Sequence, residues 1–193
     1  MNWEEVEKTE ELEEAEKPRS LFKEIMDVVI YFGGIFLLTF LIVTFVGQRT
    51  EVSGSSMYDT LENGDQLIVD KLSYRLGNPE RFDIVVFLEN PTDKTYYIKR
   101  IIGLPGETVQ IIGSGIYING ELLEENYGYE PIKKAGRAAQ KITLGEDEYF
   151  VLGDNRNNSQ DSRKEVVGNV KRSQFMGKAF IRIWPLTSFG FLE

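Results

Sequence analysis

An uncharged apolar segment near the N-terminus constrains the fold more than any other feature of this chain. Residues 28–46 read VVIYFGGIFLLTFLIVTFV and contain no charged side chain. As a helix, this segment would be roughly 28 Å long, close to the ~30 Å hydrocarbon thickness of a bilayer. A buried core helix is the alternative, and a cleaved signal peptide fits less well because a long acidic stretch precedes the segment. We therefore expect a membrane anchor over residues 21–47.

The basic residues on either side of this segment predict its orientation. Lys17, Arg19 and Lys23 precede it, whereas Arg49 is the only basic residue just after it. Basic residues are retained on the cytosolic side of a membrane, and acidic residues have little influence. We therefore expect a single-pass protein of the cell membrane. Residues 1–20 would be an acidic cytosolic tail, and residues 48–193 would form an extracytoplasmic domain.

The composition excludes several kinds of site. The chain has no histidine and no cysteine, so a Ser-His-Asp triad and a cysteine nucleophile are both impossible, and zinc is a poor candidate. The net charge is −9, of which residues 1–17 contribute −6, and no basic face for nucleic acid is evident. We expect no metal, no other cofactor and no nucleic-acid partner. For nucleophilic catalysis, the chief remaining option is a serine activated by a lysine.

The chain after the apolar segment has the pattern of a mainly β domain. Short runs rich in β-branched and aromatic residues are typical of strands, and they lie at residues 66–69, 83–88, 96–102, 108–112, 148–152 and 179–183. A hairpin is indicated where Asn119-Gly120 separates residues 116–118 from 121–123. The weak pattern of residues 124–141 predicts a long loop. We expect an antiparallel sheet or a partly closed barrel.

Two side chains are candidates for Ser-Lys catalysis. Ser56 lies in a small polar segment, and Lys99 lies in an apolar run that contains Tyr97 and Ile98. Lysine can take the proton of a serine only if burial lowers its pKa from ~10.4 toward neutrality. Each signal alone has an ordinary alternative, which is a hydroxyl-rich turn for Ser56 and a lysine that reaches solvent for Lys99.

Four segments, taken together and in order, resemble the type I signal peptidases (leader peptidases). They are GSSMYDTL at 54–61, GDQLIVDK at 64–71, RFDIVVF at 81–87 with YIKRIIGLPGE at 97–107, and GDNRNNSQDSR at 153–163. The resemblance runs from Val52 to about Pro185. The single apolar segment and the short stretch between Gly106 and Gly153 resemble the smaller Gram-positive-type members. The implied fold is a signal-peptidase-like domain with a LexA-like catalytic core.

The resemblance implies roles for the matching residues. Ser56 would be the nucleophile, with its backbone N–H as an oxyanion donor, and Lys99 would be the general base. Ser159 would hydrogen-bond the lysine amine and orient it. Residues with a structural role near the site would be Asp154, Asp161 and Arg163, the last two as an ion pair. Shallow substrate pockets would be lined by Val52, Met57, Leu61, Tyr97 and Ile98.

The implied activity is the removal of signal peptides from secretory preproteins by a serine endopeptidase. Cleavage would follow small residues at positions −1 and −3 of the precursor. The implied partners are the signal peptides of translocated preproteins, the lipid bilayer and, by proximity, the secretion translocon. The aromatic C-terminal segment, residues 183–192, fits either a bilayer interface or core packing.

Some positions leave alternatives open. Asp59 stands where the family has proline, and a carboxylate near Lys99 would favour the protonated, inactive lysine, which predicts lowered activity or a more alkaline optimum. Ser53 and Ser55 are both candidates for a second oxyanion donor. A catalytically weakened, membrane-anchored binding module of the same fold is one alternative function. A LexA-type self-cleaving protease is a weaker one, because the only Ala-Gly bond, at Ala135, follows both catalytic candidates.

Overall fold

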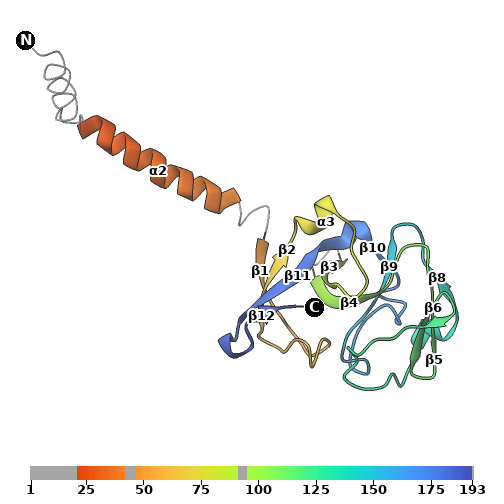
Figure 1. Ribbon diagram of the computed structural model, residues 1–193. Coiled ribbons are helices and arrows are strands. Elements are labelled where there is room, and N and C mark those ends of the chain that lie inside the picture. The colour runs from red at the N-terminus through yellow and green to blue at the C-terminus, as the bar shows by residue number, and fades with distance from the viewer. Residues whose placement is uncertain (1–20, 42–46, 91–94, 193) are drawn as a thin grey trace, which may run out of the picture. The chain divides into compact units, whose positions relative to one another are not determined.

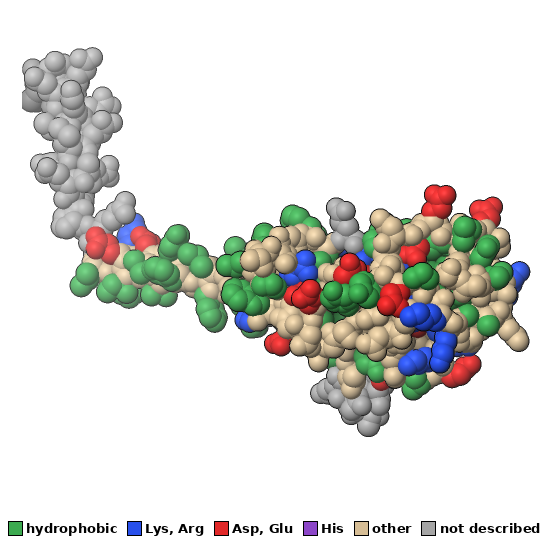
Figure 2. Space-filling view, turned by 90° about the horizontal axis from the view of Figure 1, so that it is seen from below, with side chains coloured by type: hydrophobic (Ala, Val, Ile, Leu, Met, Phe, Trp, Pro, Cys, Tyr) green, Lys and Arg blue, Asp and Glu red, His purple; other side chains and the backbone are tan. Residues whose placement is uncertain are grey.

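The computed structural model describes residues 21–41, 47–90 and 95–192, and the chain divides into two units, residues 1–42 and 43–193 (Figure 1). In the first unit the α2 helix runs from Leu21 to Leu41 without a buried side chain. Figure 2 shows apolar side chains along α2, which is long and apolar enough to cross a membrane. The expected acidic tail and the end of the expected anchor, residues 42–46, lie outside the described residues. Gly47, which we expected in the anchor, instead begins a strand.

The second unit consists of antiparallel strands in two sheets (Figure 1). The larger sheet has the order β1-β2-β11-β3-β4-β9-β10, with β12 paired to β11. Its strands are β1 (Gly47–Glu51), β2 (Gln66–Asp70), β3 (Ile84–Asn90), β4 (Thr95–Gly103), β9 (Glu148–Leu152), β10 (Val170–Lys171), β11 (Phe175–Trp184) and β12 (Gly190–Phe191). The smaller sheet, in the order β7-β6-β5-β8, consists of β5 (Thr108–Ile112), β6 (Gly115–Ile118), β7 (Glu121–Leu122) and β8 (Ile142–Thr143).

Short helices complete this unit. They are α3 (Ser73–Leu76) and three 3-10 helices, η2 (Gly136–Ala139), η3 (Arg172–Gln174) and η4 (Leu186–Ser188). Of these, η2 interrupts the long loop that we expected over residues 124–141. The mainly β, antiparallel fold is confirmed. The partly closed barrel is wrong, because the described strands form two separate sheets that do not close.

The expected strands are all present, and the strands that we did not expect are short or polar. The sequence of β1, GQRTE, has no apolar alternation, and its strand conformation follows from antiparallel pairing with β2, in which Gly47 lies opposite Asp70. The strands β8, β10 and β12 have two residues each. Such short strands are defined by their hydrogen-bonded neighbours, so a local pattern does not predict them.

Alternating burial along the central strands separates the core into clusters. Along β9, Tyr149 and Val151 pack in one cluster, whereas Phe150 and Leu152 pack in another with side chains of the smaller sheet. The same alternation sends neighbouring side chains of β4 to opposite faces of the sheet. Consequently, two adjacent basic residues of β4, Lys99 and Arg100, are both buried but have different surroundings.

The C-terminal aromatic residues are mostly outside this core. Trp184 is 52% exposed, Phe189 59% and Phe191 69%. Leu192 packs against the cluster that contains Val52. Core packing therefore accounts for Leu192 but not for the aromatic side chains.

Candidate active site

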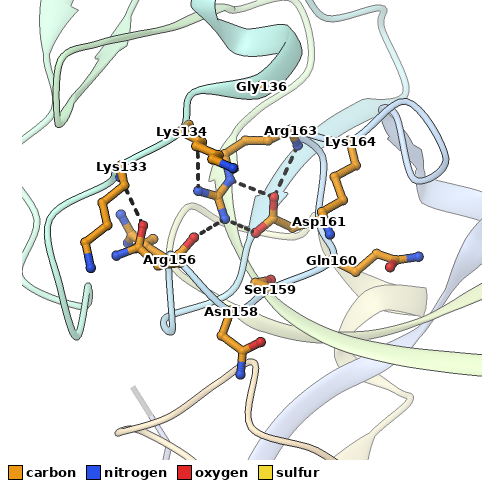
Figure 3. Close-up of a pocket in the computed structure, with 11 residues that line it drawn as sticks. Lys133, Lys134, Gly136, Arg156, Asn158, Ser159, Gln160, Asp161, Arg163 and Lys164 are labelled. Atoms are coloured by element: carbon orange, nitrogen blue, oxygen red, sulfur yellow. Dashed lines mark hydrogen bonds and ion pairs between the residues drawn. The ribbon is translucent and has the colours of Figure 1, made fainter.

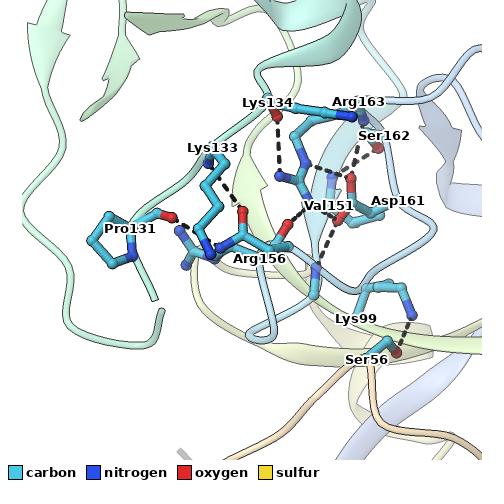
Figure 4. A network of polar contacts seen from close by, with 12 residues as sticks. Ser56, Lys99, Pro131, Lys133, Lys134, Val151, Arg156, Asp161, Ser162 and Arg163 are labelled. Atoms are coloured by element: carbon cyan, nitrogen blue, oxygen red, sulfur yellow. Dashed lines mark hydrogen bonds and ion pairs between the residues drawn. The ribbon is translucent and has the colours of Figure 1, made fainter. Parts of the chain in front are cut away.

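Ser56 and Lys99 are brought together from two distant segments (Figure 4). Lys99 extends from β4, and Ser56 lies in the turn that follows β1. The Lys99 Nζ donates to Ser56 Oγ at 2.7 Å and to the backbone oxygen of Ile98 at 2.8 Å. These distances place the nucleophile and the base of the expected pair in direct hydrogen-bond contact.

Burial prepares Lys99 to act as a base. Its side chain is 4% exposed, and desolvation lowers the pKa of Lys99 from 10.5 to about 8. The carboxylates of Asp161 and Asp154 raise this pKa, but by less than burial lowers it. Near pH 8, about half of the protein therefore has the neutral amine that can accept the proton of Ser56.

Asp59 is not placed to influence this equilibrium as we expected. It is exposed, and its charge is not among those that act on Lys99, which belong to Asp161 and Asp154. The expectation that Asp59 favours the protonated lysine is therefore wrong. The physical reason is that the turn after the nucleophile directs Asp59 toward solvent, where water screens its charge.

Ser159 lies beside the pair without the expected hydrogen bond to Lys99. Its Oγ is buried and has no hydrogen-bond partner among the described residues. The Lys99 amine binds Ser56 and the Ile98 carbonyl instead. A Cβ built on Gly153 would lie 2.3 Å from Ser159 Oγ and 2.4 Å from the backbone oxygen of Ser56. Ser159 and the nucleophile therefore pack against the same glycine.

We expect Gly153→Ala to impair the site, because the added methyl group would overlap both Ser159 and Ser56. Overpacking of this kind costs about 1–3 kcal/mol of stability. Displacement of the nucleophile by about 1 Å would lower kcat roughly tenfold to a hundredfold. Peptide cleavage and thermal unfolding of the variant would test this. Gly190→Ala is the matched control, since nothing lies within 4 Å of its added Cβ, and a loss of activity as large in the control would contradict the explanation.

Two buried ion pairs hold the loop of residues 153–163. Arg163 Nη2 lies 2.7 Å from Asp161 Oδ2, as the expected ion pair requires, and Arg100 Nη2 lies 2.9 Å from Asp154 Oδ2. The backbone N–H of Gly153 donates to Asp161 Oδ2 at 3.2 Å. The ion pairs therefore fix both ends of the loop that borders the Ser-Lys pair.

The same loop also fixes the backbone of the nucleophile. The backbone N–H of Asn155 donates to the Ser56 oxygen at 3.0 Å, and the Asn155 side-chain amide donates to the Ser55 oxygen at 3.1 Å. Asn158 Nδ2 donates to Ser55 Oγ at 3.0 Å. Within the described part of the chain, the Ser56 N–H has no hydrogen-bond acceptor, so it can donate to an oxyanion.

Sequence reasoning missed Arg100, which supports this loop from the opposite face of β4. Its side chain is fully buried, and its Nη1 donates to the Phe82 oxygen at 2.9 Å. Its guanidinium carbon lies 3.7 Å from the centroid of the Tyr127 ring. The position of Arg100 next to Lys99 in an apolar strand could have indicated that it is buried. No local pattern identified Asp154 as its partner.

A cleft of about 380 Å³ opens at Ser56 and Lys99. Three of the expected pocket residues, Val52, Tyr97 and Ile98, line it. Met57 and Leu61 do not line it; they are 1% and 0% exposed and pack in the core cluster that Val52 joins from the border of the cleft. The lining residues that we did not expect, apart from the two catalytic candidates, are Thr50, Glu51, Ser53, Gly54, Ser55, Val86, Tyr96, Asn158 and Gln160.

The comparison with known proteins agrees with this geometry. Residues 25–184 match the family described as "Signal peptidase, peptidase S26". The chain belongs to this family. The expected resemblance to type I signal peptidases is thereby confirmed, and membership makes the chain a serine peptidase of the group that removes signal peptides.

Individual signal peptidases are similar over most of the chain. A "Probable signal peptidase I-2" of Synechocystis sp. is 45% identical over 157 residues, covering 77% of this chain and 68% of that protein. The signal peptidase I of Leptolyngbya laminosa is 41% identical over 86% of this chain and 83% of its own length. The signal peptidase IB of Staphylococcus aureus (strain COL) is 32% identical over 86% and 93%, respectively. A crystal structure of a signal peptidase I from Enterococcus faecalis V583 matches with a TM-score of 0.44 and 39% identity, over 52% of this chain and 96% of that one.

Proposed function

We propose that this chain cleaves signal peptides from translocated preproteins with a Ser56-Lys99 dyad. The observation that carries the proposal is the 2.7 Å contact between Ser56 Oγ and the buried Lys99 Nζ. Neutral Lys99 takes the proton of Ser56 while Oγ attacks the carbonyl carbon of the residue at position −1. The Ser56 N–H donates to the oxyanion, an interaction worth about 3 kcal/mol in other hydrolases.

The lysine then completes both halves of the reaction. Protonated Lys99 gives its proton to the amine of the leaving mature protein, and after water enters it acts as the base for hydrolysis of the acyl-enzyme. The ammonium has three N–H groups, of which two have acceptors in Ser56 and the Ile98 carbonyl. Ser159 Oγ, buried and without a partner, is our candidate acceptor for the third, which would orient the lysine during the reaction.

We expect the cleft to favour small residues at positions −1 and −3 of the precursor. The precursor would bind as an extended strand, with Val52, Tyr97 and Ile98 against its side chains. Larger side chains at these positions would be rejected by steric overlap with Val52, Tyr97 and Ile98. Ser53 and Ser55 both line the cleft and stay candidates for a second oxyanion donor.

The helix α2 would act as the membrane anchor of this enzyme, with the N-terminus in the cytosol and the catalytic unit outside. Tethering raises the effective concentration of the enzyme where precursors emerge from the translocon. The exposed Trp184, Phe189 and Phe191 would lie in the bilayer interface, where aromatic side chains are favoured.

The test is cleavage of an Ala-x-Ala precursor by the full chain in detergent between pH 6 and 11. Because the neutral lysine is the active form, kcat/KM is expected to fall about tenfold per pH unit below the pKa of Lys99 and to level off above it. The midpoint should lie near 8. Ser56→Ala should be inactive at every pH. Cleavage that survives in Ser56→Ala, or a rate independent of pH, would contradict the dyad, and no cleavage by folded protein would favour a binding module.

A further inference from the structure

A second and larger cavity adjoins the catalytic cleft and is lined by basic side chains (Figure 3). Its volume is about 560 Å³, and it is lined by Lys133, Lys134, Gly136, Arg156, Asn157, Asn158, Ser159, Gln160, Asp161, Arg163 and Lys164. Two of these residues, Asn158 and Gln160, also line the cleft at Ser56. The two hollows therefore share a border at Asn158 and Gln160.

The arginines of this cavity already have anionic partners. Arg156 Nη2 lies 2.7 Å from Glu125 Oε2, and Arg163 Nη2 lies 2.7 Å from Asp161 Oδ2. Both guanidinium groups are almost entirely buried. They form the wall of the cavity, and the paired carboxylates neutralise their charges.

The lysines are different. Lys133 pairs with Glu130 at 2.8 Å in an exposed ion pair. In the described part of the chain, the Nζ atoms of Lys134 and Lys164 have neither an ion pair nor a hydrogen bond. Both residues are exposed, and Figure 3 shows them on opposite sides of the Asp161-Arg163 pair. The cavity therefore presents two ammonium groups that no carboxylate of the described chain neutralises.

These two lysines belong to segments that are fixed to each other. The backbone N–H of Arg137 donates to the Arg163 oxygen at 3.0 Å, and Arg163 Nη1 donates to the Lys134 oxygen at 3.3 Å. Gly136 has a φ of +57°, and a Cβ there would lie 2.3 Å from the Arg163 oxygen, so only glycine permits this approach. The backbone positions of the two lysines are therefore fixed relative to each other.

The cavity borders the cleft in which the proposed function places the precursor. In the proposed binding mode, residues before the scissile bond would occupy the cleft beside Val52, Tyr97 and Ile98, and the chain after the bond would continue past Ser56 toward Asn158 and Gln160. Asn158 and Gln160 line both hollows, so a chain that continues past them from the cleft would enter the cavity. An extended chain advances about 3.3 Å per residue, so side chains at positions +2 to +4 would reach roughly 7–13 Å past the bond.

We propose that this cavity binds an acidic side chain of the precursor at positions +2 to +4, with Lys134 and Lys164 as the groups that recognise it. The inference rests on the proposed function, because it takes the precursor as the substrate of the adjoining cleft. Exposed ion pairs are weak and are screened by salt. The expected preference for an acidic over a neutral precursor is therefore modest, about fivefold at low salt and smaller at 0.5 M salt.

The experiment uses two precursor peptides that share an Ala-x-Ala site and differ only in glutamate or glutamine at positions +2 to +4. Their dissociation constants are measured with the full-length Ser56→Ala protein in detergent, so that binding is read without cleavage. Ser56→Ala alone should bind the acidic peptide about fivefold more tightly. Adding Lys134→Gln and Lys164→Gln should remove this difference and leave the affinity for the neutral peptide unchanged.

Lys141→Gln is the matched control, because Lys141 is exposed and lies outside the cavity; it should keep the preference. Equal affinities for the two peptides, or a preference that survives the double substitution, would overturn the inference. The inference would also be overturned if the two peptides bind equally while phosphatidylglycerol in the micelles binds the protein and the double substitution abolishes this lipid binding. The cavity would then bind a lipid headgroup. Failure of wild-type protein to cleave the neutral peptide would count against the proposed function instead.

Discussion

Replacing Lys99 by methionine is expected to abolish cleavage and, at neutral pH, to make the folded protein more stable. Loss of the general base should lower kcat/KM by roughly a thousandfold or more. The gain in stability follows from burial, because Lys99 is 4% exposed and at pH 7 the wild-type protein has to keep this side chain largely protonated. Methionine has a similar length and no charge, so it should fill the same space without this penalty.

The pH dependence of this stability difference has a definite sign. The pKa of Lys99 is about 8 in the folded protein and 10.5 when unperturbed. Between these values the unfolded chain binds more protons, so wild-type stability rises with pH, and below pH 8 the whole penalty of roughly 3 kcal/mol is present. The lost hydrogen bonds of the amine offset about 1 kcal/mol of the gain. Lys99→Met should therefore be about 2 kcal/mol more stable at pH 7, lose this advantage near pH 10, and be about 1 kcal/mol less stable than wild type above pH 10.5.

Near-ultraviolet circular dichroism of the full chain in detergent, followed during thermal unfolding at pH 7, 9 and 11, would measure this difference. Ser56→Ala is the matched control, because it should be equally inactive while it keeps the buried amine and its pH dependence. A Lys99→Met protein less stable than wild type at pH 7 would show that the hydrogen bonds of the amine outweigh its desolvation.

Lys99 shows how much of the site the sequence could predict. Apart from Arg100, its near neighbours in β4 are apolar or aromatic, so the local pattern predicted a strand but left open whether the lysine is buried or reaches solvent. The contact with Ser56 joins residues 43 positions apart, and no local pattern specifies such a contact. It was predicted through the resemblance of four ordered segments to one family.

Other parts of the site required the structure because they depend on how distant segments pack. Met57 and Leu61 have the apolar character of pocket residues, but the turn after Ser56 directs them into the core. Whether the Ser159 hydroxyl has a hydrogen-bond partner depends on which acceptors the Lys99 amine binds in the folded protein. The basic cavity is assembled from residues 133–136 and 156–164, and in the sequence these two groups look like ordinary solvated charges.

Arg100→Met is expected to destabilise the protein by about 3–5 kcal/mol, because it would leave the carboxylate of Asp154 buried without its ionic partner and with only the Thr60 hydroxyl as a side-chain donor. Both side chains of this pair are inaccessible to solvent. Asp154 lies next to Gly153 and Asn155, which contact the nucleophile, so activity should fall as well. Thermal unfolding and peptide cleavage of the variant would measure the two effects.

Lys133→Ala is the control for the loss of an ion pair as such. It removes the exposed pair with Glu130, and pairs of this kind contribute at most about 1 kcal/mol. A similar loss of stability in Lys133→Ala and Arg100→Met would mean that burial has no special influence on the Arg100-Asp154 pair.

A double substitution, Arg100→Met with Asp154→Leu, separates the two causes of the Arg100 effect. If the unpaired carboxylate is responsible, removing it should restore most of the lost stability, because apolar side chains of similar volume often replace a buried ion pair without loss. The arginine also packs on Tyr127 at 3.7 Å and donates to the Phe82 oxygen, and the double substitution restores neither contact. A double variant as unstable as Arg100→Met would therefore assign the effect to these contacts, and the ion pair would serve to position the loop of residues 153–163.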